Sequence, residues 1–446
     1  MIRSTMSSQT AVADPTVIST PKAPALAGAG LMSGAMLATG ILAYAFHVLA
    51  ARSLGPTMYG QIAVLWAALF LAAVVVFRPL EQTLARSIAD RIARGEETRT
   101  VVRSVLQVFA VLLLALAVLA VPAWSPITDR LFVGSNAMTA LLFGGIATYG
   151  VSYVVRGLLG GASSFGGYAV LLVADGVGRI VLAAPLVFVA SREVAAVAIM
   201  GAGLIGAVAP LFTGFRRLVR LGEHRPHEEP FHVGAALAFA GPASVMAAAD
   251  QVLLNGGPLL VMLAGGPGAT KAAGIVFAAT MLIRVPGFLF QGVAASMLPN
   301  FTRLHAADEA VALERAVLRM AGALIAGGMA MLVAAAALGP QTMKVLYGAG
   351  YDVGRLELSL LALGVGCYLA SGTFSQGLLA LDSGSRAAVA WAVAAILFVA
   401  LYMVVPGNEL GRISVAFIAA SIVNVILLAL ALRTRVARER TNRHVV

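Results

Sequence analysis

Long apolar blocks separated by short polar stretches run through almost the whole chain. Most blocks are about 18 to 25 residues long, which lets an α-helix cross a hydrocarbon core of about 30 Å. Breaks marked by Gly, Pro and clustered charges divide the blocks into helices. The pattern predicts an all-α integral membrane protein of about twelve transmembrane helices, at residues 26–50, 60–84, 104–123, 137–158, 168–190, 194–213, 233–263, 270–300, 313–338, 356–381, 386–405 and 411–432.

Composition agrees with the membrane class. Hydrophobic residues make up 60% of the 446 positions and charged residues 11%, whereas soluble domains average about 25% charged residues. The net charge of +11 comes from Lys and Arg in short stretches between apolar blocks, without interleaved aromatic residues, so nucleic-acid binding is not indicated. Cys367 is the single cysteine, and zinc-type spacings are absent. We therefore predict no disulfide, no metal and no cofactor.

The distribution of basic residues predicts the orientation. With the N-terminus inside, the inner segments carry 22 of the 31 Lys and Arg residues and the outer segments carry 7. The positive-inside rule then predicts a multi-pass protein of the cell membrane with both termini cytoplasmic. Residues 1–25 are predicted to be a flexible tail, and the basic tail 433–446 is predicted to touch anionic lipids of the inner leaflet.

A duplicated pattern divides the chain into two halves. Gly55-Pro56 follows the first predicted span, Gly266-Pro267 follows the seventh, and the two prolines are 211 residues apart. A polar stretch, 214–232, separates the halves. Six helices per half give both copies the same orientation, and parallel repeats of this kind surround a substrate path. We predict two six-helix bundles, 26–213 and 233–432, around a central cleft.

Three motifs carry a family resemblance. They are Ala51-Arg52-x-Leu54-Gly55-Pro56-x-x-Tyr59-Gly60, Arg156-Gly157-Leu158-Leu159-Gly160-Gly161 and Val345-Leu346-Tyr347-Gly348-x-Gly350-Tyr351. In order and spacing the chain resembles the oligosaccharide flippases, or polysaccharide transporters, of the superfamily that includes multidrug and toxin extrusion antiporters and the lipid II flippase. The resemblance implies two bundles around an alternately opening cleft, and sugars on a polyprenyl diphosphate as substrate. One departure is Asn255, where relatives often carry an aspartate; here the acid is Asp250.

Arginines inside the predicted spans are the candidate substrate ligands. Arg179 and Arg284 fall near the middle of their spans, and Arg78 lies nearer the cytoplasm. A charge at mid-bilayer costs about 2.5–3.5 kcal/mol on insertion scales, so each one needs a partner or a polar cavity. The planar guanidinium donates two bonds to phosphate oxygens and keeps its charge, which suits a diphosphate.

Three acids offer the alternative explanation. Asp175 precedes Arg179 by four residues on one helix face, Glu81 follows Arg78 by three, and Asp250 shares the mid-membrane depth of Arg284. Each arginine can simply pair with its acid. Asp175 and Asp250 can also carry a coupling proton or cation.

Uncharged polar residues complete the candidate list. Tyr149 and Tyr153 lie one turn apart and can stack on a sugar or pack between helices. Gln376 and Asn424 can bond a sugar hydroxyl or another helix. The pair Gly160-Gly161 is more typical of a close helix contact than of a ligand loop.

The leading interpretation is a flippase that moves lipid-linked oligosaccharide from the inner to the outer leaflet, for envelope polysaccharide synthesis. Its partners would be the lipid-linked glycan and membrane lipids, with a polysaccharide polymerase or glycosyltransferases as further candidates. One alternative is a cation-coupled multidrug or metabolite antiporter of the same fold. A second is an enzymatic or non-transporting component of a polysaccharide assembly complex. The longest polar stretches, about 84–103 and 214–232, carry no catalytic motif, so an enzyme is not expected.

Overall fold

The computed structural model describes residues 23–213, 241–284, 297, 301 and 310–443. Helices are the regular structure of these described ranges, and ten of them are long and apolar enough to cross a membrane. The chain is therefore a multi-pass membrane protein. The helices are α1 (Ala23–Arg94), α2 (Arg99–Phe132), α3 (Asn136–Gly161), α4 (Phe165–Ala183), α5 (Arg192–Val208), α8 (Gly241–Ala264), α9 (Ala269–Ile283), α11 (Ala310–Tyr347), α12 (Arg355–Ala380), α13 (Gly384–Val404) and α14 (Glu409–Arg443).

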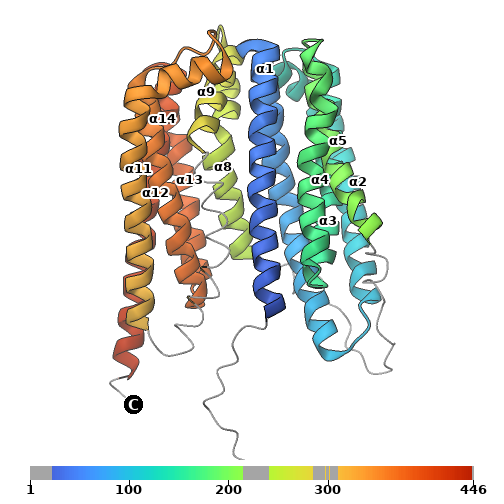
Figure 1. The fold of residues 1–446 in the computed structure, drawn as a ribbon, viewed down its shortest axis with the longest axis vertical. Helices are drawn as coiled ribbons and strands as arrows, with labels where there is room; N and C mark the ends of the chain where they lie inside the picture. Colours follow the sequence, from blue (N-terminus) through green and yellow to red (C-terminus); the bar gives the residue numbers. More distant parts are fainter. Residues whose placement is uncertain (1–22, 214–240, 285–296, 298–300, 302–309, 444–446) are drawn as a thin grey trace, which may run out of the picture.

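Helix α1 contains two spans. Its hydrogen-bonding pattern is nearly continuous, but Gly55 has φ 68° and ψ 169°, a conformation that glycine adopts readily because it lacks a Cβ. The chain reverses there, and the two legs run side by side (Figure 1). His47 of the first leg meets Trp66 of the second with ring centroids 4.4 Å apart. The two spans predicted at 26–50 and 60–84 are thus confirmed as the legs of a hairpin.

The other described helices lie at the predicted spans, but several continue past the predicted ends; α2 runs to Phe132 and α11 to Tyr347, each nine residues further. The second leg of α1 continues to Arg94, ten residues past its predicted end. Helix α14 continues to Arg443, so most of the basic segment predicted as a tail is helical. Arg and Glu favour helix formation, which explains why the helix outlasts the apolar block. The predicted linker 214–232, the parts of two spans at 233–240 and 285–300, and most of tail 1–25 lie outside the described residues.

Helices α1 to α5 form one half and α8 to α14 the other, side by side in Figure 1. Glycines allow the closest contacts within each half. A methyl group on Gly161 of α3 would lie 2.7 Å from the carbonyl oxygen of Ala85, and one on Gly328 of α11 would lie 2.8 Å from Cα of Gly366. The interpretation of Gly160-Gly161 as a close helix contact is therefore confirmed.

The halves meet tightly at the end of the molecule where α1 turns, called here the Gly55 end. Helices α1 and α9 cross there so closely that a methyl group on Gly60 would lie 1.8 Å from the carbonyl oxygen of Thr270. A methyl group on Gly274 would lie 2.2 Å from the oxygen of Pro56. The Tyr351 hydroxyl donates to the carbonyl of Ala51 at 3.1 Å. The helix segments that follow Gly55 and Gly266 thus contact each other directly. The opposite end, where the second leg of α1 finishes, is called the Arg94 end.

Candidate functional site

A buried ion pair lies near the middle of the N-terminal half. Arg179 Nη2 donates to Asp175 Oδ2 at 2.6 Å and to the Tyr149 hydroxyl at 2.7 Å. The Tyr149 hydroxyl in turn donates to the other Asp175 oxygen at 3.0 Å. The guanidinium also lies over the ring of Trp66, 5.0 Å from its centroid. Asp175 and Arg179 lie one turn apart on α4 and are nearly inaccessible, at 4% and 2% exposure. This is the Arg179 cluster, and its charges cancel.

A chain of hydrogen bonds lies at mid-membrane depth in the C-terminal half. Arg284 Nη1 donates to Asn255 Oδ1 at 3.0 Å, and Asn255 Nδ2 donates to Gln251 Oε1 at 2.7 Å. Gln251 Nε2 donates to Asp250 at 3.1 Å, and the Tyr368 hydroxyl donates to the other Asp250 oxygen. We call these five residues the Arg284 network.

Helix geometry places the Arg284 network at one level. Arg284 and Tyr368 follow the first residues of α9 and α12 by 15 and 13 positions, and Asp250 precedes the last residue of α8 by 14. All three helix ends are at the Gly55 end. At 1.5 Å per residue each side chain starts about 20 Å from that end, close to the bilayer centre.

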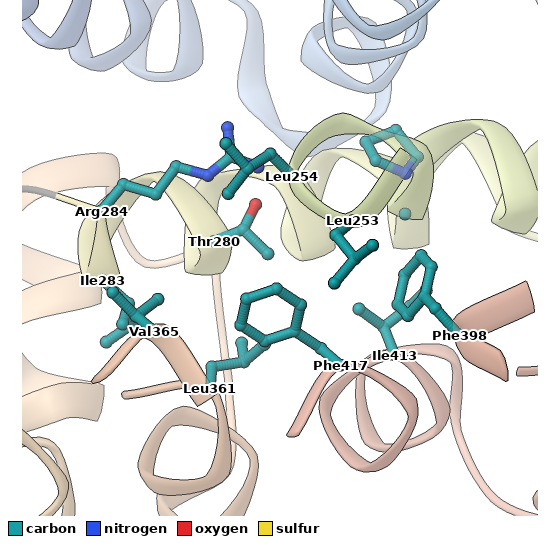
Figure 2. A pocket seen from close by; sticks show the side chains of 12 residues that line it. Leu253, Leu254, Thr280, Ile283, Arg284, Leu361, Val365, Phe398, Ile413 and Phe417 are labelled. Carbon is teal, nitrogen blue, oxygen red and sulfur yellow. The ribbon is translucent and has the colours of Figure 1, made fainter. Parts of the chain in front are cut away.

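An apolar pocket opens beside Arg284 (Figure 2). Its empty volume is about 370 Å³, including the part open to the surroundings. Aliphatic and phenyl side chains make most of the wall, while Arg284 and Thr280 supply its polar groups on α9. The remaining lining residues are Leu253, Leu254, Gly257, Pro258, Ile283, Leu361, Val365, Phe398, Ile413 and Phe417. In this conformation the space enclosed between these side chains is about the size of one water molecule, so the guanidinium lies at the edge of a narrow apolar crevice.

A third group of polar side chains lies toward the Arg94 end, between α1, α3 and α4. The Tyr168 hydroxyl donates to Glu81 Oε1 at 3.0 Å. The Arg156 guanidinium lies over the ring of Tyr153, 5.1 Å from its centroid, and its charge interacts with that of Glu81. Arg78 is exposed and lies three residues before Glu81 on the second leg of α1. These five residues are the Arg156 cluster.

The structure confirms one of the three anticipated ion pairs and corrects two. Arg179 pairs with Asp175. Arg284 bonds the neutral Asn255 instead of Asp250, and Glu81 accepts from Tyr168 instead of pairing with Arg78. The pair on α4 follows from helix periodicity alone. The other two depend on how helices are rotated against each other, which spacing does not reveal.

Other predicted residues occupy different surroundings. Tyr149 is 1% exposed, and its ring meets Phe70 edge-on, with centroids 4.9 Å apart. Its ring thus packs between helices in this conformation. Tyr153 is also buried, under Arg156. Gln376 lies on α12, two turns beyond Tyr368 and half-buried. Its substrate role stays a prediction.

Sequence reasoning missed four members of these groups: Gln251, Asn255, Tyr368 and Tyr168. Gln251 and Asn255 are spaced by four and flank an acid in an apolar helix, a signal that a search for amide side chains inside spans would have found. Tyr368 and Tyr168 carry no comparable signal, because a tyrosine within a span is ordinary. Arg156 was seen only as a topology charge and as part of a motif.

A fully buried aromatic group joins the two halves near the Gly55 end. His47 Nδ1 lies 3.2 Å from the Tyr59 hydroxyl, and the His47 ring meets Phe277 of α9 edge-on, with centroids 5.0 Å apart. Both Tyr59 and His47 are 0% exposed. This packing, together with the glycine crossing, closes the Gly55 end in the present conformation.

Comparison with known proteins supports the fold. No family model matches the chain. Two uncharacterised proteins of Mycobacterium tuberculosis are 28% identical over 320 residues and 27% identical over 357 residues. The first match covers 70% of this chain and 71% of the relative, and the second covers 76% and 77%.

Solved structures with the same architecture include transporters. An inward-facing multidrug resistance MATE family transporter of the MOP superfamily superimposes with a TM-score of 0.68 at 16% identity, over 90% of this chain and 96% of that one. The lipid II flippase MurJ, in an inward closed conformation, superimposes with a TM-score of 0.69 at 14% identity, over 93% and 91%. The chain therefore has the fold that MATE transporters and the lipid II flippase share.

Proposed function

We propose that this protein is a transporter that moves a lipid-linked oligosaccharide, or a related glycolipid with a phosphate-bearing head group, across the bilayer by alternating access. The observation that carries the proposal is Arg284. It lies at mid-membrane, a neutral amide is its one hydrogen-bond partner among the described residues, and an apolar pocket adjoins it. Asp250 balances the charge of Arg284 within the network but does not contact it, so the remaining N–H groups of Arg284 can donate to an anionic substrate.

The closed Gly55 end supports alternating access. In the orientation predicted from the basic residues this end is extracellular, so the contacts around Gly60 would form the extracellular barrier. A head group would then enter from the Arg94 end, bind Arg78 and Arg284, and leave after the contacts around Gly60 separate. The lipid chain would stay in apolar surroundings, as a flippase requires.

The antiporter alternative has a weaker basis in the N-terminal half. A coupling cation needs a free carboxylate, and Asp175 already receives hydrogen bonds from Arg179 and Tyr149. The resident guanidinium occupies the place that a cation would take. Asp250 is the remaining candidate for ion coupling, since its partners are neutral.

Transport in liposomes tests the proposal directly. The purified protein is reconstituted, and movement of a short-chain polyprenyl-diphosphate oligosaccharide between leaflets is followed over time. We expect Arg284→Gln to slow movement by about 10- to 100-fold, because hydrogen bonds to a charged group contribute about 1.5–3 kcal/mol. Arg355→Gln, an equal charge change at an exposed position on α12, is the matched control and should stay within twofold.

Two results would count against this function. Equal rates for Arg284→Gln and Arg355→Gln would remove Arg284 from the substrate path. Absence of glycolipid movement in the wild type, together with gradient-driven export of a cationic dye, would favour the antiporter. Asp250→Asn would then be the next variant to measure.

A further inference from the structure

We propose that Arg156, held over the ring of Tyr153, forms with Arg78 a second phosphate-binding subsite near the Arg94 end. It would capture the anionic head group before the group reaches Arg284. This subsite rests on the proposed function, since it assumes that the substrate carries phosphate. It adds an entry step to transport and gives Arg156 a role in substrate affinity.

Glycines in α3 bring the parts of this subsite together. A methyl group on Gly157 would lie 3.0 Å from the carbonyl oxygen of Glu81 and 3.1 Å from Cβ of Leu84. Gly161, one turn later, meets Ala85 at 2.7 Å. The second leg of α1 therefore packs against the face of α3 that carries Gly157 and Gly161, next to Arg156 in the sequence. This contact places the Glu81 segment beside α3, and Arg78 lies one turn before Glu81 on the same leg of α1.

The guanidinium of Arg156 has unused hydrogen-bonding capacity. Its Nε is sealed from solvent without a hydrogen-bond partner, and no ion pair or hydrogen bond joins Arg156 to another residue of the described chain. Glu81 does not satisfy it: its Oε1 accepts from Tyr168, and no hydrogen bond or ion pair joins Glu81 to Arg156 in the described part of the chain. The guanidinium lies over the Tyr153 ring and its Nε is sealed, which leaves the two Nη groups for a ligand. An edge-on fork of N–H donors is the arrangement that binds phosphate oxygens.

Charge makes this end of the cleft attractive to anions. The Arg179 cluster has one acid and one base, as does the Arg284 network. The Arg156 cluster has two arginines, Arg78 and Arg156, against the single acid Glu81. The excess positive charge within the cleft is therefore at the Arg94 end.

Depth identifies the source of the anion. Arg156 lies five residues before the last residue of α3, so its backbone is about 8 Å from the Arg94 end of that helix. This level is just inside the head-group region of a bilayer that is about 40–45 Å thick with its head groups, within reach of a phosphate whose lipid lies in that leaflet. A diphosphate carried on a lipid can therefore reach Arg156 while its chain stays in the leaflet. It can span two guanidinium groups, which a single zwitterionic phosphate does less well.

Equilibrium binding tests the subsite without transport. The full-length protein is placed in phosphatidylcholine nanodiscs and titrated calorimetrically with a short-chain prenyl diphosphate and, separately, with inorganic pyrophosphate. We expect Arg156→Gln to weaken binding of the prenyl diphosphate at least tenfold and Arg156→Lys to weaken it less. Arg103→Gln, an exposed position on α2 toward the same end, should stay within twofold. Tyr153→Leu should weaken binding about threefold, and Tyr153→Phe should not, because the ring alone supports the guanidinium.

The variants also separate entry from passage. In the liposome assay, Arg156→Gln should raise the half-saturating substrate concentration and keep the maximal rate within twofold, whereas Arg284→Gln should lower the maximal rate. Thermal unfolding of each variant confirms folding, and Arg156→Lys replaces Arg156→Gln if the latter fails to fold.

Several outcomes would overturn the subsite. Binding by Arg156→Gln equal to that of Arg103→Gln would do so. So would an effect on pyrophosphate alone, because it would mark a site for a soluble anion. Arg156-dependent binding of prenyl diphosphate by a wild type that moves no glycolipid would leave the subsite standing and reject the proposed transport.

Discussion

Replacing Asp175 with Asn is expected to destabilise the protein by about 3–5 kcal/mol, because it leaves a buried guanidinium without its counter-ion. Arg179 and Asp175 are almost inaccessible, and their 2.6 Å contact is supported by Tyr149. The side-chain amide of Asn has nearly the same shape but no charge. Thermal and denaturant unfolding of the protein in a mild detergent would measure the change.

A double variant identifies the cause. Asp175→Asn combined with Arg179→Gln removes both charges, so much of the lost stability should return. The matched control is Glu193→Gln, which breaks the solvent-accessible, partly buried pair with Arg192; surface pairs contribute about 0–1 kcal/mol. An Asp175→Asn variant as stable as Glu193→Gln would show that Asp175 is not needed as a counter-ion. That result would make Asp175 available for a coupling cation and strengthen the antiporter alternative.

The helix pattern was the most predictable part of the fold. Hydrophobic blocks bounded by Gly, Pro and charge located the described spans, although α1, α2, α11 and α14 continue about ten residues past the predicted ends. Apolar length is a strong signal because each span must satisfy its backbone hydrogen bonds inside the bilayer. The repeat around Gly55 and Gly266 was also visible. The physical role of this repeat was not visible, because spacing along the chain does not show that the two repeated segments contact each other.

The candidate site was predicted only in part. Asp175 and Arg179 were paired correctly because both lie on one helix face. Arg284 and Asp250 share a depth but belong to different helices. Successive residues of a helix are rotated by about 100° around its axis, so the rotation of α8 decides which of its side chains faces Arg284. Asn255, one turn further along α8, takes the bond. Partners between helices therefore needed the structure.

Arg156 shows a further limit of counting charges. Five residues from the end of its span, it was assigned to the inner polar segments, where arginines usually reach the interface. The structure turns it onto Tyr153, beside the cleft. Three arginines against three acids became four against three once this residue was included, so the neutral balance became positive, which favours an anionic substrate.

The second large effect concerns the glycine crossing at the Gly55 end. Gly60→Ala is expected to prevent this end from closing, because the added methyl group would lie 1.8 Å from the carbonyl oxygen of Thr270, a backbone atom that cannot rotate away. The conformation described here would be lost, and transport with it, since alternating access needs both end states. Spin labels at the exposed positions Val189 and Leu356, in a Cys367→Ala background, would report the distance between the halves at this end.

Gly34→Ala is the matched control, because it lies on the first leg of α1 with no atom within 4 Å of its added methyl group. The wild type and Gly34→Ala should share a short inter-label distance, whereas Gly60→Ala should show only a longer one. Gly274→Ala should behave like Gly60→Ala, since its methyl group would lie 2.2 Å from the oxygen of Pro56 on the other side of the same crossing. Unchanged distances and transport in both variants would show that the crossing is not the barrier that closes this end. A longer distance with loss of transport, in variants that still unfold cooperatively, would establish that closure at Gly60 and Gly274 is one of the two states between which the protein alternates.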